Sequence, residues 1–188
     1  MALPVNINDL LHGKPVEWER LEFKEGWNPL DVLHTICAFA NDFHNLGGGY
    51  IIVGMRESKG QPVLPPVGLN VAQIDDIQKE ILNLGYHAIQ PYYHPIVVPV
   101  ELDGRHILVI WVLGGQSRPY KAKFSLNKDS KDFGYFIRKG SSTVRAKGAD
   151  RRRAAMCGLW PLCRETCDWG FRRGGRRRRR RRPRPGPR

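Results

Sequence analysis

The stretch from Trp18 to Lys24, which reads WERLEFK, alternates apolar and charged side chains. Leu21 and Phe23 share one face of an extended chain, and Glu22 and Lys24 share the opposite face. This alternation predicts a short β-strand with one apolar face and one charged face.

A helix is predicted directly after this strand. Asn28 suits the N-cap, Pro29 the first helical position and Asp31 the first turn. Apolar residues then recur at the spacing of a buried helical face, at Leu33, Ile36, Cys37, Ala40 and Phe43. Near the end of the helix, Asn41 and Asp42 are interpreted as capping residues rather than as parts of a polar pocket.

Three glycines, Gly47, Gly48 and Gly49, separate this helix from an apolar strand predicted at Tyr50–Val53. A loop that binds nucleotide phosphates has the opposite order, because its glycines follow a strand and precede a helix N-terminus. The sequence also lacks the G-x-x-x-x-G-K-[ST] motif. We therefore predict that Gly47 ends the helix in a left-handed conformation and that the chain binds no nucleoside triphosphate.

Further along the chain, apolar periodicity predicts a second helix over Ala72–Leu84, ended by Gly85. Strands are expected at Ile96–Leu102 and His106–Leu113, joined by the hairpin turn Asp103-Gly104. A last strand, within the stretch GYFIRKGSST at residues 134–143, precedes a loop.

The predicted order β-α-β-α-β-β-β combines crossovers with hairpins. It predicts the α+β class, with a mixed sheet and helices packed on one side, in a domain over residues 10–150. Residues 151–188 differ, because they hold 15 arginines, 5 glycines and 4 prolines without any apolar period. We expect this tail to be disordered. Two interpretations stay open, a basic arm for polyanions and a frame-shifted or truncated C-terminus.

The formal net charge of +13 belongs to the tail, because residues 1–150 hold equal numbers of acidic and basic side chains. Residues 1–104 carry a net charge of −7, whereas residues 105–147 carry +8. A basic second half attracts phosphates if its cations share a face, and otherwise these are scattered solvated side chains.

The chain shows neither a signal peptide nor an apolar run long enough to span a bilayer, so a cytoplasmic protein without membrane contact is expected. Cys37 is predicted to be a buried apolar residue. The other cysteines, Cys157, Cys163 and Cys167, lack the spacing of a structural zinc site.

Four stretches together resemble, in order and spacing, the Schlafen AlbA-like domain, formerly described as a divergent AAA domain. They are EWERLEFKE at Glu17–Glu25, AFANDFHNLGGGYIIVGM at Ala38–Met55, RPY at Arg118–Tyr120 and YFIRKGSSTVRA at Tyr135–Ala146. The domain is common at the N-terminus of bacterial transcriptional regulators and helicase-related proteins. The resemblance implies nucleic-acid binding, and an ATP-dependent helicase finds no support in the motifs.

Animal relatives in this family include metal-dependent ribonucleases, whose carboxylates lie in an E-x4-E-F-K motif. This motif is matched here by Glu17, Glu22 and Lys24. A third acid follows the glycine-rich strand in the family, often as G-V-D-D, and Glu57 is its counterpart in Gly54-Met55-Arg56-Glu57. The alternative function is thus an endoribonuclease that uses Mg²⁺ or Mn²⁺ held by carboxylates.

The preferred interpretation is a non-catalytic module of a bacterial regulator that binds the phosphate backbone, of DNA ahead of RNA, and needs no cofactor. Hydroxyls beside cations suit phosphate contacts, although Ser141, Ser142 and Thr143 also suit a helix cap. Tyr120, Tyr92 and Tyr93 suit base stacking, but packing beside prolines is favoured for all three. The predicted contacts are Arg118, Tyr120, Lys121, Lys123, Arg138, Lys139, Ser141, Ser142, Thr143 and Arg145.

Overall fold

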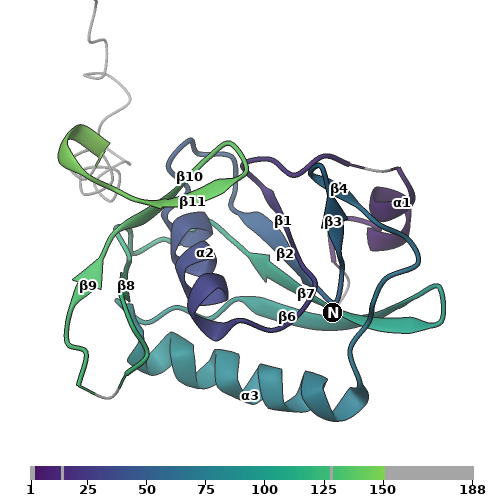
Figure 1. Ribbon diagram of the computed structural model, residues 1–188. Coiled ribbons are helices and arrows are strands. Elements are labelled where there is room, and N and C mark those ends of the chain that lie inside the picture. Colours follow the sequence, from purple (N-terminus) through teal and green to yellow (C-terminus); the bar gives the residue numbers. More distant parts are fainter. Residues whose placement is uncertain (1–2, 14, 128, 151–188) are drawn as a thin grey trace, which may run out of the picture. The chain divides into compact units, whose positions relative to one another are not determined.

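A computed structural model describes residues 3–13, 15–127 and 129–150 of the chain. Its centre is a four-stranded sheet in the order β1-β2-β7-β6, formed by β1 (Leu21–Lys24), β2 (Gly49–Val53), β7 (Arg105–Val112) and β6 (Ile96–Leu102). β1 runs parallel to β2, whereas the other neighbours are antiparallel, so the sheet is mixed as predicted (Figure 1).

Two long helices, α2 (Pro29–Asn41) and α3 (Val71–His87), cover one face of this sheet. Both begin as a helix should, because the side chains of Asn28 and Asn70 accept hydrogen bonds from backbone amides of the first turn. The apolar face predicted for α2 is buried, and it packs against alternate residues of β2 and β7. The predicted α+β architecture, with a mixed sheet and its two long helices on one side, is confirmed.

The opposite face of the sheet is covered by a short helix that the sequence analysis did not predict, α1 (Ile7–His12). Ile7 and Leu11 of this helix pack with Phe23 and Ile52 into a second apolar cluster. A small hairpin, β3 (Glu57–Ser58) and β4 (Gln61–Pro62), follows β2. None of the helices within the described residues is long and apolar enough to cross a membrane.

The remaining strands form two small sheets beside α2. One has the order β5-β8-β9 and consists of β5 (Ile89–Gln90), β8 (Lys121–Lys123) and β9 (Phe133–Gly134). The other is the antiparallel hairpin of β10 (Phe136–Lys139) and β11 (Ser142–Arg145). In Figure 1 this hairpin lies over α2, which therefore packs between the hairpin and the four-stranded sheet.

Three details of the prediction are wrong. Helix α2 ends before Gly47, because Asp42 adopts the left-handed conformation at its C-cap (φ 42°). Helix α3 runs through Gly85, whose missing side chain lets His94 pack against the helix. The segment after β10 is a strand rather than a loop, because it pairs with β10. The expected disorder of residues 151–188 lies outside the described residues.

Candidate functional site

Arg138 on β10 forms a buried ion pair with Glu22 on β1. The guanidinium donates from Nη1 to Glu22 Oε2 at 2.6 Å and to the Thr143 hydroxyl at 3.0 Å. Its other terminal nitrogen donates to the carbonyl oxygen of Trp18 at 3.1 Å. Its Nε has no hydrogen-bond partner but is buried, and with only 3% of its surface exposed Arg138 offers no accessible donor to a phosphate. The prediction that it contacts nucleic acid is therefore corrected, and the residue joins the hairpin to the sheet.

The carboxylates predicted for a metal site lie near one another. The pKa of Glu17 is raised, mainly by burial and further by the neighbouring carboxylates of Glu22 and Glu57. The hydrogen bond from the Phe23 amide acts in the opposite direction and lowers this pKa. These residues are up to 40 positions apart in the sequence, but the fold places their carboxylates close enough for their charges to interact. The carboxylate cluster is thus a real spatial feature of the fold.

The oxygens of this cluster do not fit a divalent cation. Both Glu22 oxygens are engaged by cations, one by Arg138 and the other by Lys24 Nζ at 2.9 Å. One oxygen of Glu17 accepts the Phe23 amide at 2.7 Å, and one oxygen of Glu57 accepts the Gly60 amide at 2.6 Å. Among the described residues, no group of three or more His, Cys, Asp or Glu side chains is suited to hold a metal ion.

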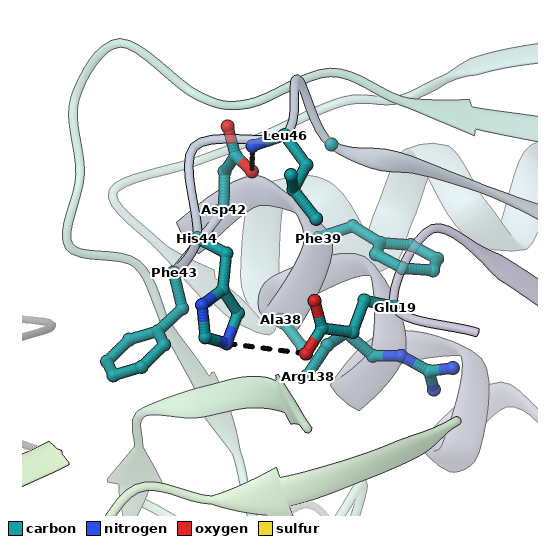
Figure 2. A pocket seen from close by; sticks show the side chains of 9 residues that line it. Glu19, Ala38, Phe39, Asp42, Phe43, His44, Leu46 and Arg138 are labelled. Atoms are coloured by element: carbon teal, nitrogen blue, oxygen red, sulfur yellow. Dashed lines mark hydrogen bonds and ion pairs between the residues drawn. The ribbon is translucent and has the colours of Figure 1, made fainter. Parts of the chain in front are cut away.

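A small cavity lies beside Arg138, between α2 and the segment that precedes β1. Figure 2 shows Arg138 and Glu19 at this cavity, with His44 Nε2 paired to Glu19 Oε1 at 3.4 Å. Its volume of about 10 Å³ is room for about one water molecule. Asp42 also lines it and caps the end of α2 as predicted, because its backbone amide donates to the Ala38 and Phe39 carbonyls. Its side chain accepts hydrogen bonds from the Leu46 and Gly47 amides.

The glycines after α2 permit close packing. A Cβ atom on Gly48 would lie 2.0 Å from the carbonyl oxygen of Val112 on β7. A Cβ atom on Gly49 would lie 2.6 Å from the Phe39 ring. These contacts bring the end of α2 against the sheet, and they account for the glycines without a nucleotide.

Asn41 is a structural bridge and not a helix cap. Its side chain accepts a hydrogen bond from the Tyr120 amide at 2.7 Å and donates to the carbonyl oxygens of Tyr120 and Phe136. Tyr120 is 4% exposed, so the prediction that it stacks on a base is corrected. Arg118 donates from Nη1 to the Asn45 side chain and to the carbonyl oxygens of Asn41 and Asp42, so this nitrogen is engaged within the protein.

A basic cleft opens among β8, β9 and β11, the strands beside α2 in Figure 1. It has a volume of about 550 Å³, and its charged lining consists of one carboxylate, Asp132, and four cations. The cations are Lys121, Lys131, Arg145 and Lys147. This cavity is called the basic cleft below.

The described carboxylates do not neutralise the cations of the basic cleft. Within residues 3–13, 15–127 and 129–150, none of the four forms an ion pair with a carboxylate. Two of them lie over aromatic rings instead. Lys121 Nζ is 5.3 Å from the centre of the Tyr135 ring, and the Arg145 guanidinium is 4.1 Å from the centre of the Phe124 ring. An aromatic face positions a cation without cancelling its charge.

The structure brings together only part of the predicted contact set. Lys121 and Arg145 line the basic cleft, whereas Lys123 lies apart from its lining and Lys139 pairs with Asp150 at 2.6 Å. The helix-cap interpretation of the hydroxyls is wrong, because the hairpin holds them in its turn and in β11. Ser141 and Ser142 are exposed there, and Thr143 bonds Thr35 and Arg138.

Sequence reasoning missed Lys131 and Lys147 as members of the cleft. Both belong to the basic segment at residues 105–147, so the charge count was the available signal. The count does not say which cations share a face, because β8, β9 and β11 meet only in the folded chain.

Solved structures resemble parts of this chain. The N-terminal domain of a RecG-related protein from Nitrosomonas europaea is 26% identical, with a TM-score of 0.47, and the match covers 61% of this chain and 74% of that one. The DIP2311 protein from Corynebacterium diphtheriae is 21% identical, with a TM-score of 0.46, and the match covers 74% of this chain and 25% of that one. None of the curated proteins matches the chain.

One family model, described as Schlafen, AlbA_2, matches residues 17–147, which is more than half of the chain and includes both the carboxylate cluster and the basic cleft. The four stretches that carry the resemblance also occupy defined places in the fold, in β1, in α2 and β2, before β8 and in the β10–β11 hairpin. The chain therefore belongs to the Schlafen AlbA_2 family.

Proposed function

We propose that this domain is a non-catalytic module that binds nucleic acid through the phosphate backbone. The observation that carries the proposal is the basic cleft, where Lys121, Lys131, Arg145 and Lys147 surround a cavity and form no ion pair with a described carboxylate. Cations that the protein leaves unpaired release counterions from a phosphate chain when they bind it, and this is the main source of sequence-independent affinity.

DNA is proposed ahead of RNA because the family is common in bacterial regulators. Both oxygens of Glu22 and one oxygen each of Glu17 and Glu57 have partners within the protein, which supports a module without nuclease activity. Addition of Mg²⁺ or Mn²⁺ is therefore expected to leave labelled RNA and DNA intact in the presence of the protein. Cleavage that depends on the metal and is lost in Glu22→Gln would overturn this part. The role in transcription and the cytoplasmic location stay predictions.

The decisive experiment reverses charges in the basic cleft of the full chain and measures binding to labelled DNA at several salt concentrations. Lys121→Glu combined with Arg145→Glu is expected to weaken binding and to reduce the slope of log affinity against log salt by about 2, roughly one per lost phosphate contact. All sequences are expected to be affected alike, because phosphate contacts carry no base information.

The matched control reverses Lys59 and Lys79, which are exposed and lie outside the cleft. It changes the net charge by the same amount and leaves the arginine-rich tail untouched. Equal losses of DNA affinity in the two double variants would show that binding follows total charge alone, and the proposed interface would then be wrong.

A further inference from the structure

Two tyrosines, Tyr86 and Tyr92, form an exposed aromatic pair near the basic cleft. Tyr86 lies in the last turns of α3 and is 58% exposed, and Tyr92 lies in the following connection and is 70% exposed. Their ring centres are 6.2 Å apart. We call this pair the tyrosine platform.

The platform is held in place by the fold. Tyr86 contacts the His94 ring edge-on, with ring centres 4.3 Å apart. His94 in turn packs where a Cβ atom on Gly85 would lie, 2.3 Å from its Nδ1. The neighbouring Tyr93 differs from the platform, because its hydroxyl donates to the Leu113 carbonyl oxygen at 2.6 Å and its ring packs against Tyr120. Packing thus accounts for Tyr93 but leaves Tyr86 and Tyr92 exposed.

The platform lies close to the basic cleft along the sequence. Gln90 lines the cleft, and Tyr92 follows it by two residues, so their Cα atoms lie within about 7 Å of each other. Gln90 pairs with Lys121 across β5 and β8, so the platform follows along the chain from a residue that neighbours one cation of the cleft. Proteins that bind single strands combine these two features, since cations contact the backbone and aromatic rings stack on bases.

We infer that the ligand of this surface is single-stranded nucleic acid, with phosphates in the basic cleft and bases stacked on Tyr86 and Tyr92. The inference rests on the proposed function, because the cleft supplies the contacts to phosphate. A duplex keeps its base faces stacked on each other and cannot use the platform. Charge complementarity favours this ligand over an apolar protein partner, which gains nothing from four unpaired cations.

The test uses the full chain and three labelled probes of equal length. The probes are an oligothymidine, a strand with the same backbone but no bases, and a duplex. A length of about 12 nucleotides lies within the site sizes of single-strand binders. The wild-type chain is expected to bind the oligothymidine at least about fivefold more tightly than the base-free strand, the effect of one stacked base. Tyr86→Leu with Tyr92→Leu is expected to remove this preference and to leave affinity for the base-free strand and the duplex unchanged.

Two further variants separate stacking from packing. Tyr92→Trp is expected to keep the preference because it keeps an aromatic face, whereas Tyr92→Leu alone is expected to reduce it. The control Trp18→Leu removes an aromatic side chain that is 50% exposed and does not line the cleft, and it is expected to change nothing. Because Tyr92 is 70% exposed, its single variants keep the test valid if the double variant fails to fold.

The outcomes distinguish this inference from the proposed function. If the base preference is absent or survives loss of both tyrosines, while Lys121→Glu with Arg145→Glu still weakens binding, the stacking inference is wrong and the proposed function stands. A platform that serves a protein partner would give this result. If the charge reversal weakens binding no more than its matched control does, the proposed function fails, and the inference that rests on it fails too.

Discussion

Replacement of Arg138 by Met tests whether this arginine holds the fold together or is available to a ligand. The side chain is 3% exposed, and its partner Glu22 is 8% exposed. Removal of one member of a buried ion pair costs about 3–5 kcal/mol, because the other charge stays buried without its partner. Here Glu22 keeps Lys24 at 2.9 Å, so the low end of that range applies. Arg138→Met is expected to lower the free energy of unfolding by about 3 kcal/mol.

A double-mutant cycle isolates the ion pair from the other contacts of Arg138. Glu22→Gln removes the charge that the guanidinium neutralises. The fall in free energy of unfolding in the double variant is therefore expected to be smaller than the sum of the two single falls, by about 1 kcal/mol or more. Urea unfolding followed by circular dichroism measures each free energy of unfolding. For a chain of this size, the loss in Arg138→Met corresponds to a fall in melting temperature of about 6–12 °C.

The matched control is Arg145→Met, because Arg145 is exposed and lies over the Phe124 ring. The fall in free energy of unfolding in this variant is expected to stay within about 1 kcal/mol. Under conditions where both variants are folded, Arg145→Met is expected to weaken nucleic-acid binding and Arg138→Met to leave it unchanged. Equal and small losses of stability in the two variants, or weaker binding in folded Arg138→Met, would refute the assignment of Arg138 to the core.

Three further expectations follow from buried polar groups. Asn41→Ala is expected to lower the free energy of unfolding by about 2–4 kcal/mol, because it leaves buried backbone groups of Tyr120 and Phe136 without partners. Urea unfolding measures this loss, and Asn83→Ala on the exposed face of α3 is the control. Burial raises the pKa of the Cys37 thiol to about 12. When folded, wild type and Cys37→Ser are therefore expected to show equal numbers of thiols that react with a disulfide reagent, and when unfolded to differ by one. A difference in the folded state would contradict the burial. Because the pKa of Glu17 is raised from 4.5 in the folded chain, the folded state binds more protons, and this residue's contribution to stability is lost as pH rises above that value. Glu17→Gln is expected to become more stable relative to wild type between pH 4 and pH 7 in thermal melts, and an unchanged difference would contradict the assigned shift.

Several elements follow from the sequence because their causes are local. Helix α2 begins where Asn28 and Pro29 predict, since an N-cap side chain and a fixed backbone angle act within one turn. The turn Asp103-Gly104 forms as expected, with both residues at positive φ, because a two-residue hairpin needs that conformation. The charge split at residues 105–147 likewise pointed to the part of the chain that holds the basic cleft.

The positions of the charged side chains were decided only by the tertiary structure. In the sequence, Arg138 and Arg145 are equivalent cations of one basic segment. In the fold, β10 carries Arg138 to the carboxylate of Glu22 on β1, more than a hundred residues earlier, while Arg145 stays exposed at the cleft. Electrostatic contacts depend on distance in space and on burial, and neither is encoded by the order of residues along a strand. For the same reason the two tyrosines of the sequence pair Tyr92-Tyr93 differ, because Tyr93 bonds the Leu113 carbonyl and Tyr92 stays exposed.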